Sequence, residues 1–126
     1  FNMFPIRSAS LLSLRQLALL TGQTAALWVR VDGRMVRIAA VEGNQEIADR
    51  RPIGKWLPID QCVPGWAVIA ANAHPDTKLT KRLNEHLASL RTTGFVWGRS
   101  SECNEYAAAI VPPEGHVFAS IAIEGG

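Results

Sequence analysis

The first part of the chain changes from a helical to a strand-like spacing of its apolar residues. Leu11, Leu14 and Ala18 recur at intervals of three and four residues, which predicts a helix over residues 7 to 21. Gly22 follows at the point where a left-handed residue commonly ends a helix. Beyond it the apolar period falls to two, so the next elements are expected to be strands.

Two alternating runs on either side of Asp32-Gly33 predict a β-hairpin. Ala25 to Val31 form the first strand, and an Asp-Gly pair between two such runs is typical of a tight hairpin turn. The second strand is expected to carry three residues on one shared face, Val36, Ile38 and Ala40. The polar segment from residue 42 to 51 has no clear period, and is left open as a loop or a twisted edge strand.

Two helices are predicted in the middle of the chain. Pro64 opens an apolar segment that runs to Ala71, and a proline suits the first turn of a helix because no amide donor is needed there. A break at residues 74 to 76 precedes a second helix, which is expected to stop at Gly94. The apolar face of that second helix is expected to hold Leu79, Leu83, Leu87 and Leu90.

The last part of the chain predicts more strands. Residues 95 to 97 are expected to be short and extended, and residues 106 to 111 and 116 to 123 to form a hairpin closed by a Pro-Pro-Glu-Gly turn. Strands joined by short turns pair antiparallel, and the helices are grouped between them. The sequence therefore predicts an α+β fold, an antiparallel sheet flanked by helices in a PAS/GAF-like (profilin-like) sensor domain.

Composition is consistent with one domain. The 126 residues are 48% apolar, which is enough to build a single core without disulfides or metals, so residues 1 to 126 are expected to form one unit. Phe1 to Met3 are left out of this argument as a candidate expression remnant. The net charge is +2, and no basic run exceeds a pair. A nucleic-acid surface is therefore not expected on this chain.

Cysteine use and hydropathy indicate a cytoplasmic location. Cys62 and Cys103 are too few and too far apart for a disulfide framework, which favours a reducing compartment and buried, inert thiols. The longest apolar stretches are far shorter than the roughly 20 residues of a membrane-spanning helix. No secretory signal pattern stands at the N-terminus, so neither a membrane anchor nor export is expected.

Three stretches, in their order and spacing, resemble the effector-binding domain of IclR-type transcriptional regulators. Residues 17 to 43 read LALLTGQTAALWVRVDGRMVRIAAVEG and are similar to the family's helix-to-hairpin segment. Residues 54 to 71 read GKWLPIDQCVPGWAVIAA and are similar to the segment where a Leu-Pro pair leads into a helix. Residues 93 to 125 resemble the family's gating loop and closing hairpin. Together the three stretches cover nearly the whole chain.

The resemblance implies a sensor rather than an enzyme. It implies a small-molecule effector, a homodimer or tetramer, and a repressor or activator that contacts DNA only through a winged helix-turn-helix domain, expected to lie outside this chain. The family's terminal helix after the closing hairpin is also expected to lie outside it. No cofactor is expected. The alternatives are a small pocket enzyme that uses Glu105 and Glu124, and a degenerate domain kept only for oligomerisation.

The resemblance also places the effector site. Seven positions that line it in the family correspond here to Leu57, Val63, Pro64, Gly98, Glu105, Ala122 and Glu124. With their neighbours, the expected effector-binding residues are Leu57, Val63, Pro64, Gly65, Trp66, Trp97, Gly98, Glu105, Ala122 and Glu124. The chain departs from the family at several of them. Asp60 and Trp66 stand where a His and a Lys are usual, and the last three lining positions are commonly Cys, Ser and Ser.

These departures bear on the ligand. Pro64 lacks an amide donor and Ala122 lacks a hydroxyl, so both weaken a site for an anion. Glu105 and Glu124 add carboxylates, which favours a neutral or cationic effector stacked on Trp66 or Trp97.

The role of the two glutamates and the possibility of a metal site are considered separately. The two glutamates can act as an acid/base pair or can pair with Arg30, Arg37 or Arg99, and an inward Arg99 would restore tolerance for a carboxylate. Three histidines, His74, His86 and His116, lack the spacing of a zinc site, so no metal is expected.

Overall fold

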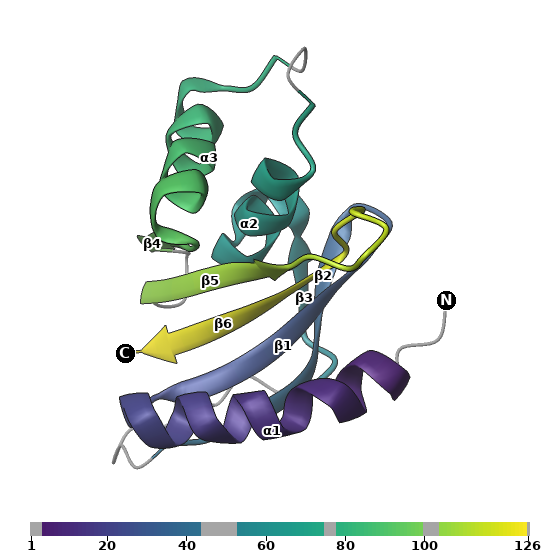
Figure 1. Ribbon diagram of the computed structural model, residues 1–126, viewed down its shortest axis with the longest axis vertical. Helices are drawn as coiled ribbons and strands as arrows, with labels where there is room; N and C mark the ends of the chain where they lie inside the picture. Colours follow the sequence, from purple (N-terminus) through teal and green to yellow (C-terminus); the bar gives the residue numbers. More distant parts are fainter. Residues whose placement is uncertain (1–3, 44–52, 75–77, 100–103, 126) are drawn as a thin grey trace.

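A computed structural model describes residues 4–43, 53–74, 78–99 and 104–125 of the chain. Six strands form one antiparallel sheet in the order β3-β2-β1-β6-β5-β4. Their bounds are β1 Thr24–Val31, β2 Arg34–Val41, β3 Trp56–Pro58, β4 Val96–Arg99, β5 Asn104–Ile110 and β6 Ala119–Gly125. Helix α1 (Phe4–Thr21) crosses one face of the sheet, while α2 (Val63–Ala71) and α3 (Lys81–Thr93) lie on the opposite side (Figure 1). The predicted α+β fold, an antiparallel sheet flanked by helices, is confirmed.

Two apolar clusters, one on each side of the sheet, hold the layers together. On the α1 side, Leu14 and Ala18 pack against Leu27 and other residues of β1. On the other side, Trp28 lies in a cluster with Val63 and further residues of α2. Because side chains alternate along β1, one strand supplies both clusters, and its fully buried run is the centre of the fold. Among the described residues, no helix is long and apolar enough to cross a membrane.

The β1–β2 hairpin forms where the sequence predicts it, with one irregularity. Asp32 takes a positive φ of 55° in the two-residue turn. The register shifts between Leu27 and Trp28, which is the mark of a β-bulge. The expectation that Val36, Ile38 and Ala40 share a face is therefore wrong. Beyond the bulge the alternation is reversed, so Ala40 packs on the α2 side while Val36 and Ile38 pack on the α1 side.

The helices match the prediction in place and differ at their starts. Helix α1 begins earlier than expected, at Phe4, and Pro5 is compatible with this start because proline is tolerated in the first turn of a helix. Helix α3 begins after Thr80, whose side chain accepts from the Leu83 amide at 3.2 Å. Leu79 therefore precedes the helix and is not on its apolar face. Gly94 ends α3 with a positive φ of 84°, as predicted.

The remaining strands differ from the sequence prediction, and β5 begins at Asn104 rather than at residue 106. The short edge strand β3 and the 3-10 turn η1 (Ile59–Gln61) were not predicted, and the segment left open at residues 42 to 51 lies mostly outside the described residues. The extended segment expected at residues 95 to 97 is β4, displaced to Val96–Arg99. The strand expected from residue 116 begins at Ala119. Its start is delayed because the Asn72 side chain donates to the Val117 carbonyl (2.6 Å) and accepts from the Val117 amide (2.8 Å), replacing a neighbouring strand.

Candidate functional site

Three strands align a row of predicted site residues across the sheet. The register pairs Gly98 of β4 with Glu105 of β5, and Glu105 with Glu124 of β6. Cross-strand partners face the same side of a sheet, so the three residues share one face. Ala122, two positions before Glu124, lies on that same α2 side. The hairpin geometry therefore brings together four residues that are far apart in the sequence.

The first turn of α2 lies directly against this row. Val63, Pro64, Gly65 and Trp66 are all buried there. A Cβ atom added at Gly98 would come 2.7 Å from Cζ3 of Trp66, so the strand and the indole ring are in close contact. The Ser120 hydroxyl donates to the Pro64 carbonyl at 2.9 Å, which ties the start of α2 to β6.

A buried ion pair lies in the same layer. The Arg37 guanidinium of β2 is 2.8 Å from Oε2 of Glu124, and the two side chains are 2% and 0% exposed. The Trp28 indole N–H donates to Oε1 of the same carboxylate at 3.0 Å. Of the three arginines considered from the sequence, Arg37 is the partner of Glu124. The sequence did not single out Trp28, although its place two residues after Ala26 put it on the same buried face.

Glu105 adds a second carboxylate to this layer. It is 0% exposed, and its cross-strand partner is Glu124. Arg99 does not reach it from β4, because the burial of that strand alternates and Arg99 lies on the exposed face, opposite Gly98. Within the described residues, the face therefore holds two buried carboxylates and one buried guanidinium.

Trp66 is held on several sides. Its indole N–H donates to the Asp60 carbonyl at 2.8 Å. From α3, the His86 ring stacks on it at 4.9 Å with an interplanar angle of 11°, and the Arg82 guanidinium lies 4.1 Å from the ring centroid. Burial lowers the pKa of His86 below 6.5, the charge of Arg82 lowers it further, and Glu85 opposes the shift. The neutral imidazole is therefore the favoured form beside Trp66.

The structure separates one predicted residue from the rest. Trp97 alternates with Gly98 along β4 and is 53% exposed on the α1 side of the sheet, 6.3 Å from the ring of Tyr106. It cannot contact a ligand that lies beneath α2. Leu57, on the edge strand β3, is half-buried and packs against the cluster that contains Val63. Nine of the ten expected residues thus gather around the first turn of α2.

The remaining expectations concern the cysteines and a metal site. Cys62 is fully buried, as predicted, and Cys103 lies outside the described residues. In the described part of the chain, no group of three His, Cys, Asp or Glu residues could hold a metal ion.

Comparison with known protein families shows to which family the chain belongs. It matches the family model for the C-terminal domain of the bacterial transcriptional regulator IclR over residues 2–124. The chain therefore belongs to the family of IclR C-terminal domains, as its sequence resemblance indicated. No curated protein sequence gives a significant match.

Solved structures share the fold along almost the whole chain. A candidate IclR transcriptional regulator from Silicibacter sp. TM1040 has a TM-score of 0.80 at 20% identity, with 96% of this chain and 56% of that chain covered. An IclR-family regulator from Brucella abortus gives 0.77 at 22%, with 95% and 52% covered. The IclR protein of Thermotoga maritima gives 0.72 at 21%, with 99% and 57% covered. This chain thus spans about half the length of these three regulators.

Proposed function

We propose that this chain is the effector-binding and oligomerisation domain of an IclR-type transcriptional regulator. The observation that carries the proposal is the gathering of the seven family site positions, together with Gly65 and Trp66, around the first turn of α2, in a chain of this family. The ligand would lie between that turn and the row formed by Gly98, Glu105 and Glu124. Such a domain acts from the cytoplasm on DNA through a helix-turn-helix domain.

We infer that the effector is neutral or cationic. Arg37, the buried cation of this layer, already pairs with Glu124. Pro64 offers no amide donor and Ala122 no hydroxyl, so two groups that would hold an anion are missing. An anionic ligand would also be buried beside Glu105, and burying like charges together costs several kcal/mol. Hydrogen-bond donors of the ligand would instead meet carboxylate oxygens.

Calorimetry with a metabolite series tests both points. We expect amines and neutral aromatic compounds to bind the wild type and keto acids to bind weakly. Glu105→Gln should weaken amine binding by about tenfold or more, since a charge-assisted hydrogen bond becomes a neutral one. Glu114→Gln, an exposed position, is the matched control. Tight binding of keto acids with no binding of amines would contradict the proposed charge preference and leave the proposed location to be tested with Gly98→Leu.

Regulation would follow from differential affinity. A ligand shifts a regulator between two states only by binding one of them more tightly. Palindromic operators are read by two-fold dimers, so we expect the domain to form at least a dimer. Sedimentation of the chain at high protein concentration tests this, and a purely monomeric profile would count against it.

The oligomerisation-only alternative has one specific observation in its favour. Trp66 is 5% exposed and fills the space against Gly98 where a smaller residue would leave room. A domain without effector binding would give no thermal shift with any compound of a metabolite library. The enzyme alternative has less support, because Arg37 and Trp28 hold the Glu124 carboxylate and leave it poorly placed as an acid or base. Turnover of the bound compound would argue for it.

A further inference from the structure

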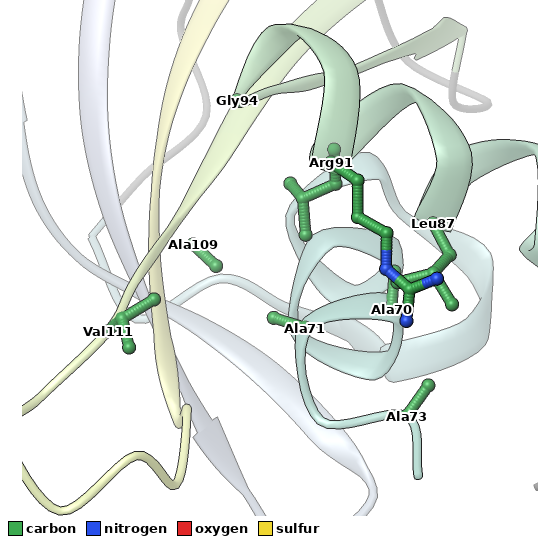
Figure 2. A pocket seen from close by; sticks show the side chains of 9 residues that line it. Ala70, Ala71, Ala73, Leu87, Arg91, Gly94, Ala109 and Val111 are labelled. Carbon is green, nitrogen blue, oxygen red and sulfur yellow. The ribbon is translucent and has the colours of Figure 1, made fainter. Parts of the chain in front are cut away.

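A cavity lies where the C-terminal ends of α2 and α3 meet the end of β5 (Figure 2). Its volume is about 340 Å³, within the range of roughly 300–1,000 Å³ that is usual for small-molecule sites. Much of its lining is alanine: Ala70, Ala71, Ala73 and Ala109. Since an alanine side chain ends at Cβ, these positions leave open the space between two helices and a strand. The cavity therefore has room for one small molecule on an apolar floor.

Arg91 gives this cavity a charge. It stands in the last turn of α3, and in Figure 2 its side chain extends over α2, with the guanidinium between Leu87 and Ala70. The lining contains no carboxylate, and Arg91 forms no ion pair with any residue in the described part of the chain. A planar guanidinium with five N–H donors is suited to a two-point hydrogen bond with a carboxylate.

The partial negative charges at the C-terminal ends of α2 and α3 disfavour an anion in this cavity, but they do not outweigh the positive charge of Arg91. A helix C-terminus carries about half a negative charge, and its effect fades within the last turn. The last turns here are also capped, because the Gly94 amide donates to the Leu90 carbonyl at 2.9 Å and the Asn72 amide to the Val68 carbonyl at 3.1 Å. Arg91 carries a full charge on a long side chain, so an anion at its guanidinium lies away from those carbonyls.

We propose that this cavity is a second ligand site, which takes a small amphipathic carboxylate. The apolar tail lies on the alanine floor and beside Leu87, and the carboxylate binds Arg91. The site is separate from the candidate effector site, since the two share no lining residue: α2 contributes its first turn to one and its last turn to the other. The two sites also differ in chemistry, because the effector site holds two buried carboxylates.

Calorimetry of the chain with octanoate, 1-octanol and octylamine at about 0.15 M salt tests the charge preference. Octanoate should bind most tightly. Arg91→Gln should weaken octanoate binding by about tenfold or more and leave 1-octanol unchanged. Arg15→Gln, which removes an exposed arginine on α1, should have no effect. Equal affinity for the three compounds, no binding of octanoate, or an unchanged affinity of Arg91→Gln would each overturn the proposal.

Neighbouring alanines of β5 provide the test of location. The side chain of Ala109 packs on the α2 side, whereas the side chain of Ala108 points to the opposite groove beside α1, whose lining also includes Ala109. We expect Ala109→Leu to abolish octanoate binding and Ala108→Leu to retain it; the reverse result would place the ligand in the other groove and refute the site. If Ala109→Leu does not fold, Ala73→Leu fills the same cavity from beyond α2. Glu105→Gln should leave octanoate binding unchanged, which keeps this test independent of the proposed effector site.

Discussion

At the scale of single residues, the buried charges are the most unusual feature of this domain. Arg37 and Glu124 lie with Glu105 in a buried layer whose other residues are mostly apolar, and Trp28 provides a further hydrogen bond to the Glu124 carboxylate. A buried ion pair gains little over apolar packing, but removing one partner leaves a charge without compensation. The pair connects β2 and β6, the two strands on either side of β1.

The first prediction concerns this pair. Arg37→Met should lower the free energy of unfolding by about 3–5 kcal/mol, because Glu124 stays buried without its guanidinium. Adding Glu124→Gln should recover part of the loss. Urea unfolding of the wild type, both single variants and the double variant measures the coupling. Arg34→Met, at an exposed position of the same strand, should cost no more than about 1 kcal/mol. Additive effects of the two buried substitutions would contradict this account.

His86 is expected to make stability depend on pH. Its pKa in the folded state lies below 6.5, so as pH falls the unfolded chain takes up the proton first. The stability gained from the neutral ring is therefore present above pH 6.5 and is lost as pH falls toward the lowered pKa. The wild type should lose more of its thermal midpoint between pH 7.5 and pH 5 than His86→Gln does. Parallel midpoint curves for the two proteins would be evidence against this role of His86.

At the scale of elements, one glycine determines how closely α2 approaches the preceding turn. A Cβ atom at Gly65 would collide with the backbone of Ile59, at the start of η1. Backbone cannot move aside as a flexible side chain can, so Gly65→Ala must displace the start of α2. The first turn of α2 is also the part that faces the candidate effector site, so packing and site geometry depend on the same residue.

The matching prediction compares two glycines. Gly65→Ala should destabilise the fold by about 1–3 kcal/mol or more, and should weaken any effector binding at the first turn of α2. Gly33→Ala is the control, because a Cβ atom there meets nothing within 4 Å and its φ is not positive. Thermal unfolding of both variants is the measurement. Equal stability of the two would show that α2 can shift freely.

Elements were predicted from the sequence where local signals were strong. Alternation and Asp32-Gly33 defined the hairpin, and Gly94 defined the end of α3. The misses arose from contacts between distant residues. The bulge in β2, at Ile38, depends on pairing with β1, and the late start of β6 depends on Asn72, which lies far from it in sequence. Neither feature has a local signal.

At the scale of the whole molecule, the positions of the candidate site came from the family resemblance and not from residue patterns. Family positions placed Val63, Gly98 and Glu124 in one region; the sheet register aligns Gly98 with Glu124 through Glu105, and Val63 of α2 lies against Gly98. Trp97 was assigned to this region because it neighbours Gly98, but alternation turns adjacent strand residues to opposite faces. The cavity beside Arg91 had no sequence signal, since alanines in a helix look like ordinary helix formers.

The last prediction concerns DNA. Positive charge is distributed over both sides of the sheet. Arg15 lies on α1, whereas Arg82 and Arg91 lie on α3, and the two helices are on opposite sides of the sheet (Figure 1). The charge of Arg37 is neutralised by Glu124. Binding to the phosphate backbone requires several cations on one face, and each adds to the salt dependence. This chain should therefore bind duplex DNA only non-specifically, with a Kd no tighter than about 10⁻⁶ M at about 0.15 M salt. Gel-shift titration with unrelated duplexes is the measurement. Sub-micromolar, sequence-selective binding would show that a DNA-reading surface exists on this domain after all.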